Sequence, residues 1–465
     1  MERREFLKKA GLGAAALGLA AGCKSAAGTA ASATSGNTPA SKAPAASGTL
    51  ASSAASGTAP GQVIQNYPGV GLLGYGCMRW PLVDPDDPSQ GVDQEKVDEM
   101  VSYAMSHGVN YFDSAPVYLG GQSEEATAAA LSKYPRESYL IATKLSNFRS
   151  SSRSFEEGWK MYQRSLEIYN TDYIDYYLLH SVGNVPGFEA RFLRNGLLDA
   201  LVKERELGHI RHLGFSAHCD PETFSYLMDL HPKYKWDFVQ IQMNYIDWNH
   251  AGKRNSNASL LYSELEKRGI PVVIMEPLLG GELARVPGGI ADELKSREPS
   301  RSVASWAFRF CGSFPKVLTV LSGMSSMDVL EDNVRTFSDF KPLGEDEFSL
   351  LERAAETISK YKLVGCTACQ YCMPCPYGIN IPGIFRFYND SVRAGTYVVS
   401  AEQKHFERER RRYLAAYGKA VPSVRQADHC IGCGQCLEKC PQHINIPVEL
   451  RKIDRYVEKL KQGKL

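Results

Sequence analysis

The stretch Asn110-Tyr111-Phe112-Asp113-Ser114-Ala115-Pro116-Val117-Tyr118 is a short apolar run that stops at an acid and continues through a loop to a tyrosine. Catalytic barrels built from parallel strands place their chemistry at the carboxyl ends of those strands. A buried strand that ends at Asp113, with Tyr118 in the following loop, is therefore expected to supply two residues of a catalytic site.

Two later apolar runs also end in ionisable side chains. The run at 139–144 ends at Lys144, and the run at 174–180 ends at His180. A phenol has a pKa of about 10 and is a poor proton donor unless a neighbour lowers that value. A nearby ammonium does so, and an imidazole beside the same oxygen can hold a substrate carbonyl. We therefore predict one acid–base set, made up of Asp113, Tyr118, Lys144 and His180.

This set, in this order along the chain, resembles the catalytic tetrad of the aldo/keto reductase family. The resemblance implies that Tyr118 is the general acid, that Lys144 and His180 adjust its pKa, and that Asp113 orients Lys144. It further implies a small carbonyl compound or alcohol as substrate and NADP(H) or NAD(H) as cofactor. A single Asp or Lys at a strand end is more typical of a surface ion pair, so the prediction depends on the four residues occurring together.

From 67 to 343 the chain alternates short apolar runs with amphipathic segments, a pattern typical of βαβ units. Helices are expected, for example, at 95–107, 155–169 and 258–268. Eight strand candidates in a segment of this length predict an α/β fold, the (β/α)8 TIM barrel. The candidates are 71–76, the three runs that end at Asp113, Lys144 and His180, and then 211–216, 238–243, 271–276 and 317–322.

The family resemblance also implies a nicotinamide site. Its carboxamide contacts fall on Ser216 and Gln240, and its pyrophosphate loop on the segment 277–281, although ordinary turn formation also explains the glycines of that loop. The implied cofactor residues are Ser216, Gln240, Pro277, Leu278, Gly280, Gly323, Asp332 and Asn333.

Several positions depart from the family pattern. Ala217 stands where asparagine is common, and Met275 stands where many members have an aromatic residue that stacks on the nicotinamide ring. The basic residues that hold a 2′-phosphate in many members correspond to Gly323 and Val329. The resemblance therefore does not choose between NADPH and NADH.

Eight of the 12 cysteines lie in two short clusters near the C-terminus, which indicates metal binding rather than disulfide bonds. Each cluster ends in Cys-Pro, and each continues into the same Ile-Asn-Ile-Pro repeat. Zinc is the alternative occupant, because paired Cys-x-x-Cys motifs also suit that ion. The cysteines are Cys366, Cys369, Cys372 and Cys375 in the first cluster and Cys430, Cys433, Cys436 and Cys440 in the second.

These cysteines resemble those of bacterial-type dicluster ferredoxins, which implies two [4Fe–4S] clusters. In that pattern the cysteine before the proline serves the other cluster, so Cys440 is expected to join the first set and Cys375 the second. The long segment between the sets, including 400–417, is expected to be helical. We therefore predict that 344–465 forms a small, mainly α-helical dicluster ferredoxin domain.

Residues 1–23 resemble a twin-arginine export signal, with Arg3-Arg4 followed by an uncharged Ala/Gly/Leu run. The segment 19–23 is similar to a lipobox, in which Cys23 would be acylated; cleavage without acylation is the alternative. Residues 24–66 are rich in Ala, Ser, Gly and Thr, a composition typical of a flexible linker. We predict an exported protein on the periplasmic side, attached to the membrane as a lipoprotein through Cys23.

The formal net charge of +1 gives no support for nucleic-acid binding, and no run has the length of a membrane-spanning helix. We predict an exported oxidoreductase that interconverts a carbonyl and an alcohol with a nicotinamide cofactor and exchanges single electrons with a redox partner protein. Free dinucleotide is not expected outside the cytoplasm, so this hypothesis requires a cofactor bound tightly before export. Two alternatives stay open: clusters that only brace a plain aldo/keto reductase, or an electron-transfer lipoprotein whose barrel is a docking platform.

Overall fold

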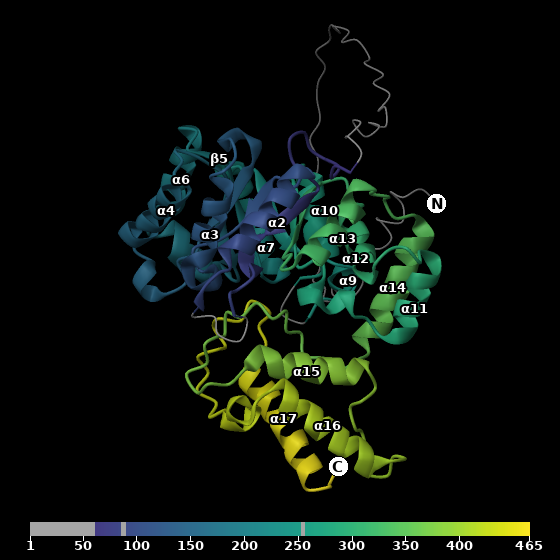
Figure 1. Ribbon diagram of the computed structural model, residues 1–465. Coiled ribbons are helices and arrows are strands. Elements are labelled where there is room, and N and C mark those ends of the chain that lie inside the picture. The colour runs from purple at the N-terminus through teal and green to yellow at the C-terminus, as the bar shows by residue number, and fades with distance from the viewer. Residues whose placement is uncertain (1–60, 85–89, 253–255) are drawn as a thin grey trace, which may run out of the picture. The chain divides into compact units, whose positions relative to one another are not determined.

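The computed structural model describes residues 61–84, 90–252 and 256–465. Within these residues, eight parallel strands close into a barrel in sequence order, with β8 pairing back to β1. Helices follow the strands and surround them (Figure 1). This arrangement confirms the predicted (β/α)8 barrel. The strands are β1 Leu73–Gly76, β2 Tyr111–Asp113, β3 Leu140–Leu145, β4 Ile174–Val182, β5 Ile210–Ala217, β6 Phe238–Gln242, β7 Val272–Met275 and β8 Val317–Ser322.

The barrel helices begin and end at residues with local signals. For α4 (Phe155–Tyr169), the Ser154 hydroxyl accepts a hydrogen bond from the Glu157 N–H (3.2 Å), and Asn170 ends the helix in the left-handed conformation. Both α4 and α10 have the bounds predicted from the sequence. The other barrel helices are α2 Gln94–Ser106, α3 Gln122–Leu131, α5 Val185–Phe188, α6 Leu197–Glu206, α7 Pro221–Asp229, α8 His231–Tyr234, α9 Asp247–His250, α10 Ala258–Arg268, α11 Gly288–Arg297, α12 Val303–Gly312 and α13 Met327–Ser338.

Aromatic side chains cross the interior of the barrel. Tyr111 of β2 contacts Tyr176 of β4 with ring centroids 4.9 Å apart, and Tyr176 contacts Phe238 of β6 at 5.1 Å. Because β2, β4 and β6 are not neighbours in the barrel, these contacts span its lumen. They belong to a buried cluster, the lumen core, made up of Val70, Tyr111, Ala142, Tyr176, Leu178, Phe238, Val273, Leu318 and Leu321.

The helix α14 (Glu345–Ser359) packs on the barrel. Phe348 contacts Phe310 and Phe314 of the barrel at ring-centroid distances of 5.6 and 5.8 Å. The separate core of the C-terminal domain begins only at Val364. The domain boundary predicted at 343 is therefore too early, because α14 buries its apolar face against the barrel.

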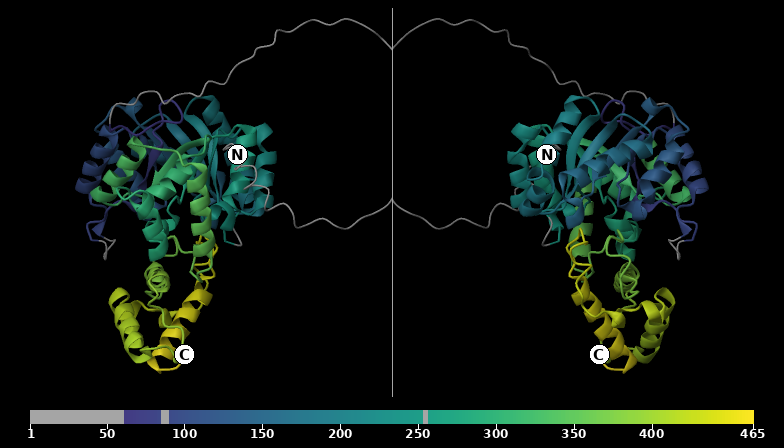
Figure 2. Two further views of the ribbon diagram at one scale, coloured as in Figure 1. Left: turned by 90° about the vertical axis from the view of Figure 1, so that its right-hand side faces the viewer. Right: turned by 90° about the vertical axis from the view of Figure 1, so that its left-hand side faces the viewer.

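Three helices, α15 (Ile381–Arg393), α16 (Phe406–Ala420) and α17 (Ile446–Lys461), enclose the core of the C-terminal domain (Figure 1, and from two other sides in Figure 2). Both α15 and α17 start with Ile-Pro after an asparagine, so the sequence repeat forms two equivalent helix starts. The helix predicted at 400–417 begins only at Phe406, after His405 with a φ of 65°.

The packed chain begins before the predicted boundary at 67. Val63 is buried, and its N–H donates to the His107 carbonyl (2.9 Å), while the Ile64 N–H donates to the Phe337 carbonyl (3.1 Å). The last residues of the predicted 24–66 linker therefore belong to the barrel. The predicted export signal, Cys23 and the rest of that linker lie outside the described residues.

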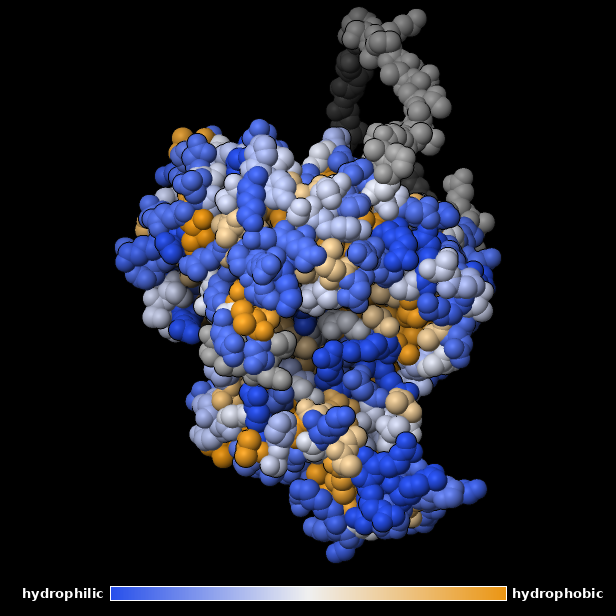
Figure 3. All heavy atoms as spheres, viewed as in Figure 1, coloured by the Kyte–Doolittle hydropathy of each residue, from blue (hydrophilic) through white to orange (hydrophobic). Residues whose placement is uncertain are grey.

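Polar side chains predominate on the face in Figure 3, and apolar ones are scattered over it. In the described part of the chain, no helix is both long enough and apolar enough to span a membrane. The apolar side chains of the barrel and of the C-terminal domain are concentrated in their respective cores.

Candidate active site

The side chains predicted to carry the chemistry form the next layer above the lumen core. Alternate residues of a strand point to the same face, and three of the four predicted residues lie two positions beyond a residue of the lumen core. The pairs are Asp113 after Tyr111, Lys144 after Ala142 and His180 after Leu178. Their side chains therefore meet inside the barrel at the carboxyl ends of β2, β3 and β4, which we call the mouth of the barrel.

Lys144 and Asp113 form a buried ion pair. Lys144 Nζ lies 2.6 Å from Asp113 Oδ1 and 2.7 Å from the carbonyl oxygen of Ser114, and the two side chains are only 1% and 4% exposed. The ammonium also lies 4.9 Å from the centre of the Tyr118 ring. Burial raises the pKa of the Asp113 carboxyl, and the charge of Lys144 offsets part of that rise. The pair thus holds a positive charge beside the phenol.

Tyr118 and His180 meet at the same place. Tyr118 begins a short 3-10 turn after β2, and its ring packs edge-on against His180 at 5.7 Å. Burial raises the pKa of Tyr118 well above its usual value. Burial, with repulsion from Lys144 and Arg191, lowers the pKa of His180 well below its usual value. At neutral pH the phenol therefore keeps its proton and the imidazole is neutral, with Nδ1 held 2.6 Å from the Ser146 hydroxyl.

Two residues implied for the carboxamide lie side by side. Ser216 of β5 and Gln240 of β6 are partners in register, and both are buried. The Ser216 hydroxyl accepts a hydrogen bond from the Ser181 N–H (2.7 Å). Gln240 Oε1 is buried with no hydrogen-bond partner among the described residues. This side of the mouth retains a free polar group that could hold a ligand amide.

The residues implied for the adenine side lie after β8. Asn333 of α13 is buried and donates to the Ser322 hydroxyl (2.9 Å), while Asp332 is partly exposed. Gly323 lies under the side chain of Arg79, since a Cβ at position 323 would be 3.1 Å from Arg79 Cδ. Asn333 and Gly323 are therefore already engaged by side chains of the protein itself.

The loop implied for the pyrophosphate already has partners within the protein at Gly280. The turn Pro277-Leu278 leads to Gly280, whose N–H donates to the carboxyl of Glu276 (2.6 Å). A Cβ on Gly280 would lie 2.5 Å from both the Cα and the carbonyl oxygen of Thr367. An acid thus takes the amide that a phosphate would need, and backbone fills the space above it. A pyrophosphate bound at the Gly280 amide, as the family resemblance implies, does not fit this arrangement.

Thr367 belongs to a loop of the C-terminal domain that reaches the mouth of the barrel. Arg79 Nη2 donates to the Thr367 carbonyl (2.6 Å), and the Tyr371 hydroxyl lies 3.3 Å from His180 Nε2. The rings of Tyr371 and Tyr118 are 6.3 Å apart. Sequence reasoning missed these residues because Thr367 and Tyr371 lie between cluster cysteines and match no motif.

Glu276 carries a sequence signal of the same kind as Asp113. It ends the apolar run at 271–276, as Asp113 ends the run before it. An acid at the end of a barrel strand is the pattern that identifies Asp113, so the same rule applied to every strand would have included Glu276.

The cysteines gather in two sets that each draw on both sequence clusters. Cys440 lines one cavity together with Cys366, Cys369 and Cys372, and the walls of that cavity are otherwise mainly apolar, including Ile381, Phe385, Ile444 and Ile446. Burial raises the pKa of Cys436, and its neighbours Cys430, Cys433 and Cys375 add to that rise. Within the described residues, no three His, Cys, Asp or Glu side chains are arranged to hold a single metal ion. Four sulfurs around one cavity suit the larger cubane implied by the sequence.

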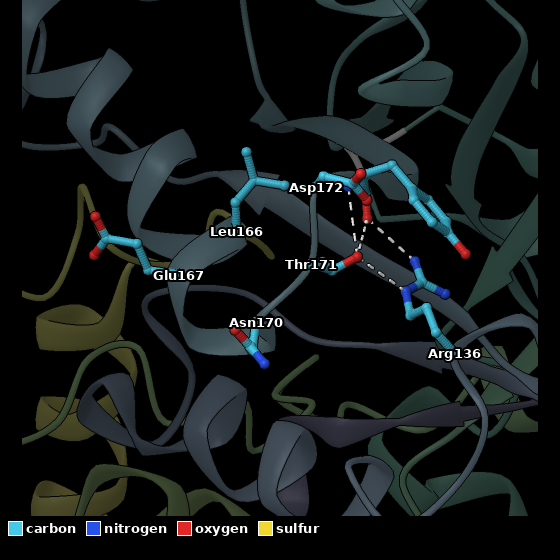
Figure 4. A pocket seen from close by; sticks show the side chains of 7 residues that line it. Arg136, Leu166, Glu167, Asn170, Thr171 and Asp172 are labelled. Carbon is cyan, nitrogen blue, oxygen red and sulfur yellow. Dashed lines mark hydrogen bonds between the residues drawn. The ribbon is translucent and has the colours of Figure 1, made fainter.

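A second cavity lies where α4 ends and β4 begins (Figure 4). Arg136 donates there to the Thr171 hydroxyl (3.2 Å) and pairs with Asp175 (2.6 Å). Because these residues precede or begin β4, the cavity lies at the amino ends of the strands, where barrel residues serve stability rather than catalysis. Its lining residues are Arg136, Leu166, Glu167, Asn170, Thr171, Asp172 and Tyr173.

Two family models match the chain. The one described as "Aldo/keto reductase family" covers residues 72–356, and the one described as "4Fe-4S dicluster domain" covers residues 365–446. The chain is 26% identical over 270 residues to the L-galactose dehydrogenase of Arabidopsis thaliana, which covers 54% of this chain and 81% of that protein. It is 34% identical over 174 residues to the probable aldo-keto reductase 1 of Glycine max, covering 35% of this chain and only 46% of that relative.

Solved structures of similar proteins include an aldo-keto reductase from Klebsiella pneumoniae in complex with NADPH. The identity is 20%, the match covers 61% of this chain and 90% of the other, and the TM-score is 0.48. An aldo-keto reductase from Bacillus halodurans, in its holo form, is 24% identical over 61% of this chain and 92% of its own, with a TM-score of 0.46.

Proposed function

Because the chain belongs to the aldo/keto reductase family, we propose that this oxidoreductase interconverts a carbonyl group and an alcohol at Tyr118. One observation carries the proposal. The buried Lys144–Asp113 pair holds its ammonium 4.9 Å from the Tyr118 ring, and His180 packs against the same ring. A buried charge is costly unless it is paired. The paired ammonium of Lys144 lies beside a phenol, and this position favours a catalytic role.

In the direction of reduction, the Tyr118 hydroxyl donates a proton to the carbonyl oxygen of the substrate. Negative charge then develops on the phenol oxygen, and the ammonium of Lys144 stabilises it. Asp113 keeps Lys144 in place, while neutral His180 presents Nε2 to the same substrate oxygen without adding charge. In the direction of oxidation, the same groups take the proton back.

The carbonyl carbon also needs two electrons and a second proton, and that proton would come from water. The cysteine sets around Cys440 and around Cys375 would hold two [4Fe–4S] clusters, which supply single electrons when bound. The dinucleotide predicted from the sequence does not fit the residues around Gly280, so the proposed roles of Tyr118, Lys144 and His180 do not depend on it.

We also propose that the protein works outside the cytoplasm. Support comes from the Arg3-Arg4 pair, from Cys23 at the end of an uncharged run, and from the linker that follows. Twin-arginine export carries folded proteins, which suits a chain that must acquire clusters before it leaves the cytoplasm.

The first prediction tests the general acid. Tyr118→Phe should lower the rate of carbonyl reduction by roughly 10²–10⁴-fold, the usual contribution of a general acid. Reduction of a panel of aldehydes and ketones by the cluster-loaded protein would be followed with NADPH, NADH or a one-electron viologen dye as donor. The rate of the variant is compared with the parent for whichever donor supports turnover.

Tyr177→Phe is the matched control, because the Tyr177 hydroxyl is buried with no hydrogen-bond partner among the described residues. It should keep the parent rate. Full activity of Tyr118→Phe would overturn the proposed function. A parent that reduces no carbonyl with any donor, while its clusters still exchange electrons with the dye, would favour the docking-platform alternative.

A further inference from the structure

The part of the C-terminal domain between Cys366 and Cys372, which we call the cluster loop, lies against the mouth of the barrel. We propose that the cluster loop takes the place of a dinucleotide there, so that the intact protein does not bind NAD(P) in the manner its family implies. The inference concerns the site of the proposed function and rests on it for the roles of Tyr118 and His180.

One contact brings two backbone segments together. Thr367 is only 1% exposed, and its Cα and carbonyl oxygen lie 2.5 Å from the point where a Cβ of Gly280 would be. Gly280 has a φ of 68°, a conformation open to glycine. Close approach of backbone to a ligand is a usual reason for such a glycine. In this protein the approaching group is Thr367 of the same chain.

The chemistry of the loop after β7 also opposes a phosphate. The N–H of Gly280 donates to the carboxyl of Glu276 (2.6 Å), which is partly buried. A pyrophosphate would have to displace this acid or lie next to it. The Gly280 amide is therefore already taken, which makes the loop unsuitable for the ligand that the family resemblance assigns to it.

The nearest cation is engaged as well. Arg79 follows β1 and would be a natural partner for a phosphate. Its Nη2 instead donates to the Thr367 carbonyl (2.6 Å), and its side chain covers Gly323. Arg79 therefore ties the cluster loop to the position where the resemblance expects the adenine end of the cofactor.

The cluster loop extends from there to the catalytic residues. The Tyr371 hydroxyl is 3.3 Å from His180 Nε2, the nitrogen that faces the substrate oxygen in the proposed mechanism. Further contacts surround this one: Gln442 donates to Gln242 (2.8 Å), His443 Nε2 lies 3.2 Å from the His218 carbonyl, and Arg393 pairs with Glu282. The C-terminal domain therefore meets the barrel from β1 round to the loop after β7.

With a dinucleotide excluded, the redox groups that this chain would offer are the clusters that its two cysteine sets would hold. This arrangement also removes the requirement for a dinucleotide loaded before export, because no dinucleotide would be needed outside the cytoplasm.

The first test measures binding without turnover. Protein with intact clusters, checked by their visible absorbance, is titrated with NADPH, NADP⁺, NADH and NAD⁺ by calorimetry. No saturable binding is expected up to about 1 mM, the upper end of ordinary Michaelis constants. Saturable micromolar binding, or a dinucleotide released when the purified protein is denatured, would overturn the proposal. An active Tyr118→Phe variant would instead remove the proposed function and leave this binding result unchanged.

The second test uses two neighbouring glycines. Gly280→Ala should push the cluster loop away, whereas Gly281→Ala is the matched control, because it too has a positive φ (93°) but no atom within 4 Å of its added Cβ. Hydrogen exchange of the peptide covering 366–372 should rise roughly tenfold or more in Gly280→Ala relative to Gly281→Ala, as expected for overpacking. Equal exchange in the two variants would show that Thr367 does not cover Gly280, and the proposal would fail.

Discussion

Single buried residues set the charge of the site. Lys144, Asp113 and His180 lie inside the barrel, where burial penalises every charged form. The barrel retains one ion pair there, with Lys144 and Asp113 at 2.6 Å, and keeps His180 and Tyr118 neutral. The ammonium is therefore the group that can stabilise a phenolate when Tyr118 gives up its proton.

The second prediction concerns this pair. Lys144→Met leaves the Asp113 carboxyl buried without a partner, and the free energy of unfolding should fall by about 3–5 kcal/mol. Lys144→Met combined with Asp113→Asn should cost less than the two single changes added together, because the double variant buries no lone charge. Denaturant unfolding followed by tryptophan fluorescence measures all three variants.

The control for this cycle is the exposed pair of Lys160 and Glu157 on α4. Lys160→Met should hardly change stability, because water already solvates both groups. If Lys144→Met were as stable as the parent, Lys144 and Asp113 would not depend on each other for their burial.

At the scale of secondary-structure elements, local signals and tertiary packing have different weights. The strands and most helices follow from apolar periodicity and caps, as α4 shows with Ser154 and Asn170. The helix α14 begins where the Gly344 N–H donates to the Glu347 carboxyl (2.8 Å) and has a strong apolar face, yet neither feature says which domain that face covers. Its aromatic contacts with Phe310 and Phe314 assign it to the barrel.

The third prediction tests that assignment. Phe348→Ala removes the ring that joins α14 to the barrel and should lower the stability of the barrel by about 3–5 kcal/mol, the usual cost for a buried phenylalanine. Phe155→Ala is the matched control, since Phe155 is 37% exposed. The denaturant midpoint is read from tryptophan fluorescence, and the visible absorbance of the clusters is followed in parallel. Loss of cluster absorbance with an unchanged barrel midpoint would place α14 with the C-terminal domain instead.

At the scale of the whole molecule, the two cysteine sets connect segments that are far apart in sequence. Cys440 lines the cavity of Cys366, Cys369 and Cys372. Cys375 lies among the neighbours of Cys436. Each prospective cluster would therefore join both halves of the C-terminal domain, as the ferredoxin pattern implies.

The fourth prediction follows from this exchange of cysteines. Cys375→Ser should change most strongly the electron paramagnetic resonance signal of the cluster held by Cys430, Cys433 and Cys436. Cys372→Ser is the comparison, and it should change the other cluster instead. Two variants that alter the same cluster would contradict the crossing, and a metal analysis that finds zinc without iron or sulfide would exclude iron–sulfur clusters altogether.

The fifth prediction concerns attachment to the membrane. Cys23→Ser should move the protein from the membrane fraction to the soluble exported fraction, because a lipid on Cys23 is the proposed anchor. Replacing Arg3-Arg4 with two lysines is a control for the export route and should keep the protein in the cytoplasm. Unchanged fractionation of Cys23→Ser would favour cleavage without acylation.

The sequence by itself determined the barrel, and its resemblance to known families predicted the four residues at the mouth and the membership of the cysteine sets. These features depend on short-range patterns: short apolar runs that end in Asp113, Lys144 and His180, and Cys-x-x-Cys spacing closed by proline. Such patterns can be read locally because strand pleating and cluster size fix the spacing of the residues involved.

Only the tertiary structure decided what covers that mouth. Tyr371 meets His180 across 191 positions of the chain, and Thr367 covers Gly280 although neither residue matches a motif that predicts the other. The family resemblance assigned the same place to a dinucleotide. The glycines there allow a pyrophosphate to approach closely, and they allow a backbone to approach in the same way. Whether a dinucleotide or a backbone segment occupies this place depends on how the C-terminal domain docks on the barrel. No local pattern of the sequence predicts that docking.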